Sequence, residues 1–190
     1  GEELVRICYE SGIEVTSLPG ACACITALTL SGLSTRRFAF EAFLPKDKKE
    51  RADILSGLKD ETRTIILYEA PHHLLKTLEE LYDALGDRNL TLCRELTKRY
   101  ETICPTTISE AISSYNSQEP KGEFVLIIQG KSLQEIKEAK QQEWNGIPLK
   151  EHMEHYEIQG ISHKEAMKLV AKDRGISKRD VYAMLLKETS

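Results

Sequence analysis

The segment from Arg94 to Glu101 carries the residue types that general acid–base chemistry uses. Glu95 and Lys98 lie three positions apart, with Arg94 before them and Glu101 three positions further on. A carboxylate within reach of a hydroxyl can remove its proton, and a nearby ammonium can stabilise the charge that develops or neutralise a phosphate. The same side chains can also form an exposed ion-pair cluster that contributes little. We take Glu95 and Lys98 as candidate catalytic residues and keep the surface cluster as the alternative.

Histidine and cysteine spacings do not predict a metal site. His152 and His155 lie three residues apart, whereas the zinc-protease pattern requires a separation of four with glutamate after the first histidine. We interpret both as surface residues of an amphipathic helix. The cysteine count of five is odd, and most of these residues sit in apolar stretches, which favours reduced thiols. Cys22 and Cys24 are too close in sequence for a zinc knuckle, so we expect both to pack in the core.

The C-terminal tail is locally basic although the whole chain has a net charge of −4, which excludes a uniformly basic nucleic-acid binder. Cationic side chains that neutralise phosphates give RNA affinity without reading sequence. We therefore predict RNA contact through the tail, with a helical cap that merely packs as the alternative. The predicted contacts are Lys164, Lys168, Lys172, Arg174, Lys178 and Arg179.

The elements that position these residues alternate between strands and helices. Strand patterns cover residues 13–18, 37–43, 62–68, 89–96, 100–104 and 122–129, and helical patterns cover 21–30, 46–59 and 71–85. Thr107 and Glu110 form a capping box that opens another helix. Strands separated by helices favour a helix-covered parallel sheet, and the close pair 89–96 and 100–104 favours an antiparallel hairpin. We predict an α/β fold with a mixed, mostly parallel sheet.

The β pattern ends near Gly130. We therefore divide the chain into an α/β domain (1–130), a linker helix (131–146) and a helix-turn-helix-like extension (147–190). With 41% hydrophobic residues the chain can bury a core, yet it has no apolar run of the roughly 18 residues that span a bilayer. We expect a cytoplasmic protein without a membrane segment.

Four segments and a closing strand together carry a family resemblance. They are Leu18–Leu28 (LPGACACITAL), Phe40–Pro45 (FEAFLP), Leu67–His72 (LYEAPH), Cys93–Lys98 (CRELTK) and Lys121–Val125 (KGEFV). In this order and spacing the chain resembles the ribosomal RNA 2′-O-methyltransferases of the tetrapyrrole (corrin/porphyrin) methylase superfamily. The resemblance covers about 130 residues, and the lysine-rich tail is similar to the extension of this branch.

The resemblance implies a function and a fold. Members of the superfamily hold S-adenosylmethionine between two α/β domains, and this chain resembles the second domain with its extension. It implies methyl transfer to a cytidine 2′-hydroxyl of small-subunit ribosomal RNA, little activity without the first domain, and a homodimer. By motif, Cys22, Ala23, Glu69 and Leu96 would contact the donor, and Glu95 and Lys98 would face the acceptor. The chain departs from the family pattern at one position: after Pro71 and His72, where relatives often carry arginine, it has His73.

Two other functions stay open at this stage. A tetrapyrrole methyltransferase would share the fold and the donor site. A non-catalytic nucleic-acid-binding module would explain the helix-turn-helix pattern alone. The methylase interpretation requires that the loops after Leu18, Tyr68 and Leu96 meet at one edge of one sheet, since ligands bind at strand ends in such folds.

Overall fold

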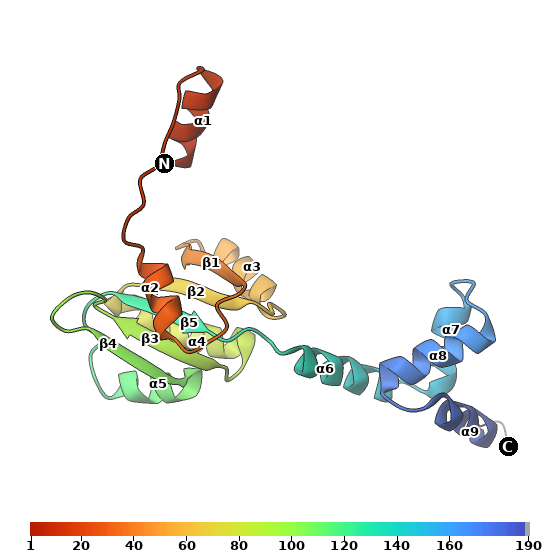
Figure 1. Cartoon of the computed structure of the whole chain (residues 1–190). Helices are drawn as coiled ribbons and strands as arrows, with labels where there is room; N and C mark the ends of the chain where they lie inside the picture. Colours follow the sequence, from red (N-terminus) through yellow and green to blue (C-terminus); the bar gives the residue numbers. More distant parts are fainter. Residues whose placement is uncertain (189–190) are drawn as a thin grey trace.

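The computed structural model describes residues 1–188, and its central part is built on a five-stranded sheet (Figure 1). The strands are β1 (Phe38–Phe43), β2 (Thr64–Glu69), β3 (Asn89–Arg94), β4 (Thr102–Thr107) and β5 (Phe124–Ile128). Their order across the sheet is β1-β2-β5-β3-β4. The α/β class and the mixed sheet are confirmed, as is the antiparallel β3–β4 hairpin.

Parallel pairing is the minority in this sheet, so the expectation of a mostly parallel sheet is wrong. Among the described strands only β1 and β2 pair in parallel, and β5 pairs antiparallel with both β2 and β3. The helical crossovers do make β1, β2 and β3 run in one direction, as strand-helix-strand units should. However, β5 runs in the opposite direction between β2 and β3 and separates them. The carboxyl ends of β1, β2 and β3 still lie at one edge of the sheet.

Helices cover both faces of the sheet and define two cores. On one face α2 (Ala23–Leu30) packs on β2 and β5. On the other lie α3 (Lys48–Leu58), α4 (Leu74–Leu85) and α5 (Ile108–Asn116), with the 3-10 turn η1 (Pro71–His73) before α4. The core on the α2 face contains Cys24, Ala27, Leu28, Ile66, Cys93, Val125 and Ile127. The predicted capping box at the start of α5 is confirmed, with Thr107 and Glu110 each bonding the other's backbone.

The segment before α2 departs from the prediction. The helix α1 (Glu2–Glu10) stands apart from the sheet (Figure 1). Residues 13–18 form no strand, and Ile13 and Leu18 are 56% and 88% exposed. An alternating pattern alone does not make a strand, because the backbone also needs a neighbouring strand to bond. No strand of the described sheet pairs with this segment.

The helices that follow the sheet share a separate core. Those within the described residues are α6 (Leu133–Asn145), α7 (Leu149–Glu157), α8 (His163–Arg174) and α9 (Lys178–Glu188). The buried apolar residues of this core come from α7, α8 and α9 and are Leu149, Met153, Ala166, Val170, Ala171 and Val181. Gly175, with a φ of +66°, ends α8 and turns the chain into α9, in line with the predicted helix-turn-helix-like pattern. Within residues 1–188 no helix combines the length and apolar composition that crossing a bilayer requires.

His152 is fully buried, so its interpretation as a surface residue is wrong. Its ring stacks on Trp144 with centroids 3.7 Å apart, and its Nδ1 accepts a hydrogen bond from Arg174 Nε at 3.1 Å. Asp173 lies 3.4 Å from Nε2 and also accepts from the Tyr156 hydroxyl. Burial, and then the Arg174 charge, lower the pKa of His152 below its ordinary value, although Asp173 opposes this.

This lowered pKa predicts that acid weakens the helical extension. The folded protein binds the proton less readily than the unfolded chain does, so stability is complete above the unfolded pKa of about 6.5. Stability is then lost as pH falls from there through the folded pKa. Urea unfolding followed by fluorescence of the single tryptophan, Trp144, should show a falling midpoint below about pH 6.5. His152→Gln should flatten this dependence; an unchanged pH profile in the variant would contradict the prediction.

Candidate functional site

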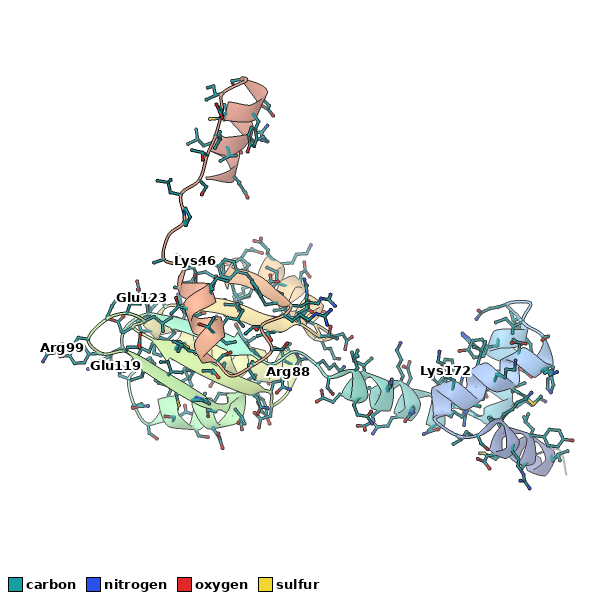
Figure 2. All side chains as sticks on the ribbon, viewed as in Figure 1. Lys46, Arg88, Arg99, Glu119, Glu123 and Lys172 are labelled. Atoms are coloured by element: carbon teal, nitrogen blue, oxygen red, sulfur yellow. The ribbon has the colours of Figure 1, made fainter. Side chains whose placement is uncertain are left out.

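The carboxyl edge of the sheet gathers the segments that the sequence singled out. Glu69 ends β2, Arg94 ends β3, and Phe124 at the start of β5 pairs with both. The end of β1 lies beside the end of β2, with Phe43 opposite Tyr68. Figure 2 shows Lys46, Glu123 and Arg99 toward this end of the domain and Arg88 toward the other, near α6.

Tyr68 connects β2 to β1 and to the start of α2. We call Cys22, Ala23, Tyr68 and Leu96, which lie around this connection, the lip. The Tyr68 hydroxyl accepts a hydrogen bond from the backbone N–H of Cys24 at 3.0 Å, which ties the start of α2 to β2. The Phe40 and Phe43 rings meet the Tyr68 ring edge-on, with centroids 5.1 and 5.5 Å apart. Leu96 packs against the same core as Tyr68. The loops after Leu18, Tyr68 and Leu96 therefore converge, as the methylase interpretation requires.

Cys22 and Ala23 present small, exposed groups at this lip. They lie at the beginning of α2, where the backbone can be approached closely. The Cys22 and Cys24 thiols are 3.3 Å apart. The hydrogen bond from Cys24 lowers the pKa of Cys22, and burial raises the pKa of Cys24. Cys24 is in the core as expected, whereas Cys22 is exposed, contrary to its predicted packing role.

The Glu69 carboxylate faces away from the lip. It accepts hydrogen bonds from the Thr77 hydroxyl at 2.5 Å and from the Ala70 N–H at 2.8 Å, and it is 6% exposed. Alternation along β2 places Tyr68 on the α2 face and Glu69 on the α4 face. Only the backbone of Glu69 lies at the edge near the lip, so its carboxylate is not placed with Cys22, Ala23 and Leu96.

Glu95 and Lys98 form a bonded pair in the loop that follows β3. The Glu95 carboxylate accepts from the Glu123 N–H at 2.9 Å and from Lys98 Nζ at 3.2 Å, and Lys98 also reaches the Glu123 carboxylate at 3.0 Å. The Glu123 N–H and then Lys98 lower the pKa of Glu95, and the two carboxylates raise the pKa of Lys98. Glu95 is therefore a weak base here, while Lys98 stays cationic.

The backbone of this loop is strained. Glu95 and Thr97 have φ values of +51° and +64°, which L side chains rarely adopt. The Glu101 carboxylate fastens the loop by accepting from the Thr97 N–H at 2.6 Å. Gly122 lies opposite it with a φ of +84°, which favours glycine, and a Cβ there would lie 2.6 Å from the Glu95 Cγ, so that side chain would have to shift. Strain held by such surrounding contacts is typical of functional loops.

A cavity of about 580 Å³ lies on the face of the sheet that carries α3 and α4, and Glu69 is the one lining residue that the sequence predicted to contact a ligand. It opens at the carboxyl ends of β1 and β2. Its lining consists of Phe43, Leu44, Pro45, Lys46, Arg51, Glu69, Ala70, His72, His73 and Lys76. The signal was present in the segments FEAFLP and LYEAPHH, which end these two strands, because strand ends are where ligands bind in α/β sheets.

The basic side chains of the extension divide into two groups. Lys164, Lys168 and Lys172 are exposed and four residues apart, so they share one face of α8. Arg174 differs, because it is 8% exposed and donates to His152 and to the Ile147 carbonyl. A guanidinium that is buried in this network cannot meet RNA, which corrects the prediction for this residue. Lys178 and Arg179 begin α9, half-buried and exposed respectively.

Comparisons with known proteins agree with this geometry. Residues 1–112 match the family model described as Tetrapyrrole (Corrin/Porphyrin) Methylases. The chain is 44% identical over 182 residues to ribosomal RNA small subunit methyltransferase I of Bacillus subtilis, covering 96% of the chain and 62% of the relative. The Synechocystis protein of the same name is 40% identical over 187 residues, covering 98% and 65%.

A structural comparison supports the same fold. The crystal structure of the methyltransferase CobJ matches with a TM-score of 0.52 at 18% identity, covering 68% of this chain and 56% of that one. The chain thus spans 62–65% of the length of these two curated relatives. From the family match and the identity along nearly its whole length, the chain belongs to the tetrapyrrole (corrin/porphyrin) methylase family.

Proposed function

We propose that the complete protein containing this chain transfers a methyl group from S-adenosylmethionine to the 2′-hydroxyl of a cytidine in small-subunit ribosomal RNA. The observation that carries the proposal is the convergence of the Cys22, Tyr68 and Leu96 segments at one sheet edge in a chain 40–44% identical to two proteins named as small-subunit rRNA methyltransferases.

The lip offers one side of a binding site for the donor. Cys22 and Ala23 offer small side chains and accessible backbone, and Leu96 offers apolar surface to an adenosine. Glu69 would contribute through its backbone only. The donor supplies an electrophilic methyl group on a sulfonium. The residues of this chain contribute by alignment, since in-line displacement depends on the position of the acceptor oxygen.

The test is to incubate the complete protein with labelled donor and unmethylated small ribosomal subunits, and then to map the modified nucleotide. Methylation of a cytidine ribose supports the proposal. Methylation of a tetrapyrrole acceptor instead of RNA would replace it with the ring-methylase function, and the absence of donor binding would leave a nucleic-acid-binding module. Because the 190-residue chain supplies one lip of the site, it should bind the donor weakly by itself.

We further propose that Lys98 is the cation facing the acceptor and that Glu95 positions it. Lys98→Ala should lower turnover by about 10–100-fold, because a charge aimed at the reacting group is lost. Glu95→Gln should lower turnover less, because the amide still accepts from the Glu123 N–H. Single-turnover kinetics of the complete protein measure both. Lys121→Ala is the control for removing a nearby lysine, and unchanged turnover in Lys98→Ala would refute the role.

The basic face of the extension is proposed to contact ribosomal RNA. Lys164, Lys168 and Lys172 provide an exposed stripe on α8, with Lys178 and Arg179 beside it. Changing the three α8 lysines to alanine should weaken RNA binding. The slope of log affinity against log salt concentration should become less steep by about 0.7–0.9 for each phosphate that is no longer neutralised. Filter binding at several salt concentrations measures this. The matched control changes Lys137, Lys140 and Lys150 on α6 and α7, and equal weakening in both triple variants would argue against a specific surface.

The proposal includes three further features: the domain division, the oligomeric state and the cellular location. We propose that the chain divides into residues 1–130, a linker helix at 131–146 and an extension at 147–190, a division that the separate cores support. We also propose that the complete protein is a homodimer and acts in the cytoplasm, as the family resemblance implies. Light scattering after size exclusion tests the dimer.

A further inference from the structure

The cavity at the ends of β1 and β2 holds more positive charge than its neighbours neutralise. Lys46 lines it and forms no ion pair with any residue in the described range. His72 and His73 are exposed at its rim, with ring centroids 4.2 Å apart. Lys76 is only loosely held, 3.7 Å from Glu80. An anionic group that enters this cavity would therefore find cationic or hydrogen-bonding partners on two sides.

The wall of the cavity is held in place by internal bonds. Arg51 donates to the Glu80 carboxylate at 2.5 Å and to the Thr77 hydroxyl at 2.7 Å, and Thr77 donates in turn to Glu69. The carboxylates of Glu69 and Glu80 are thus occupied by partners within the wall. They bind the wall together and leave the Lys46 charge at the opening available to a ligand.

An exposed aromatic ring joins this cavity to the lip. Phe43 lines the cavity, is 61% exposed, and meets Tyr68, which bonds to the start of α2. Aromatic faces beside cationic side chains are the combination that binds single-stranded nucleic acid, with the base stacked and the backbone neutralised. The volume is within the range of pockets that enclose small ligands.

We infer that this cavity is the subsite for one unpaired ribonucleotide of the RNA substrate, with its base against Phe43 and its phosphate at Lys46, His72 and His73. The inference rests on the proposed function, which it deepens. It assigns acceptor-side binding to the ends of β1 and β2, where Phe43 of the cavity meets Tyr68 of the donor lip. Phe43 and Lys46 are positioning residues, because they hold the nucleotide and do not touch the reacting atoms.

The first experiment measures binding of a fluorescein-labelled single-stranded oligoribonucleotide to the 190-residue chain by anisotropy. Phe43→Leu and Lys46→Ala should each weaken binding about tenfold. Lys46→Ala should also reduce the slope of log affinity against log salt by about 0.7. The matched controls are Phe38→Leu at the other end of β1 and Lys140→Ala on α6, which should stay within about twofold of the parent. Circular dichroism confirms that each variant is folded.

The second experiment measures methylation of small ribosomal subunits by the complete protein. Both variants should raise KM for RNA while kcat changes little. Normal methylation and unchanged RNA affinity in both variants would overturn the subsite and leave the proposed function intact. The expected decreases in RNA affinity without any methyl transfer by the parent protein would instead refute the function and keep the subsite. Equal decreases in the variants and their controls would also overturn it.

Discussion

Replacing Ala23 with arginine should abolish methyl transfer by the complete protein, with a loss on the order of a hundredfold or more. Ala23 is exposed at the start of α2, beside the hydrogen bond that joins Cys24 to Tyr68. A long cationic side chain there would occupy the space in which the donor should lie and would repel its sulfonium. Isothermal titration with S-adenosylmethionine and single-turnover assays measure the two effects.

The same substitution should leave the domain folded, because the Ala23 side chain is not part of either core. Thr29→Arg, an exposed position at the far end of the same helix, is the matched control and should keep both donor affinity and turnover. Ala23→Ser should also remain active. If Ala23→Arg binds the donor as tightly as the parent does, the assignment of the donor site to this lip is wrong.

Phe124→Ala should cost about 3–5 kcal/mol of unfolding free energy, which is a large part of the stability of a small domain. Phe124 is 2% exposed, pairs with both Glu69 and Arg94 across the sheet, and meets the Tyr115 ring edge-on at 5.7 Å. Its removal leaves a cavity under α5 where neighbouring strands cannot collapse. Urea unfolding followed by circular dichroism measures the decrease.

A control on the edge strand separates burial from the mere loss of an aromatic ring. Phe38→Ala, at a position that is 36% exposed on β1, should cost about 1–2 kcal/mol, because this side chain buries less apolar area. Comparable decreases in the two variants would show that Phe124 is not a centre of this core.

Local signals in the sequence identified most of the elements. The Thr107 and Glu110 capping box, the helical pattern of residues 71–85 and the closely spaced β3–β4 pair each act between residues that are near one another in the chain. Such interactions depend little on the rest of the fold. The motif segments were also identified correctly as neighbours, since strand ends after helical crossovers must meet at one edge.

Interactions between distant parts of the chain decided the rest. The insertion of β5 between β2 and β3 made the sheet mainly antiparallel, and no local pattern encodes that position. The face on which Glu69 lies followed from strand register, and the burial of Arg174 followed from the packing of α8 against Trp144 and His152 on neighbouring helices.

The sequence by itself therefore determined the family, the order of the elements and the segments that form the site. Only the tertiary structure decided which side chains of those segments are bonded within the chain and which are open to solvent. The type of a residue states what it can bond, but the bonds it makes depend on what packs beside it. Glu95 and Lys98 are bonded to each other and to Glu123, whereas Lys46 and Phe43 line an open cavity that local sequence patterns did not predict.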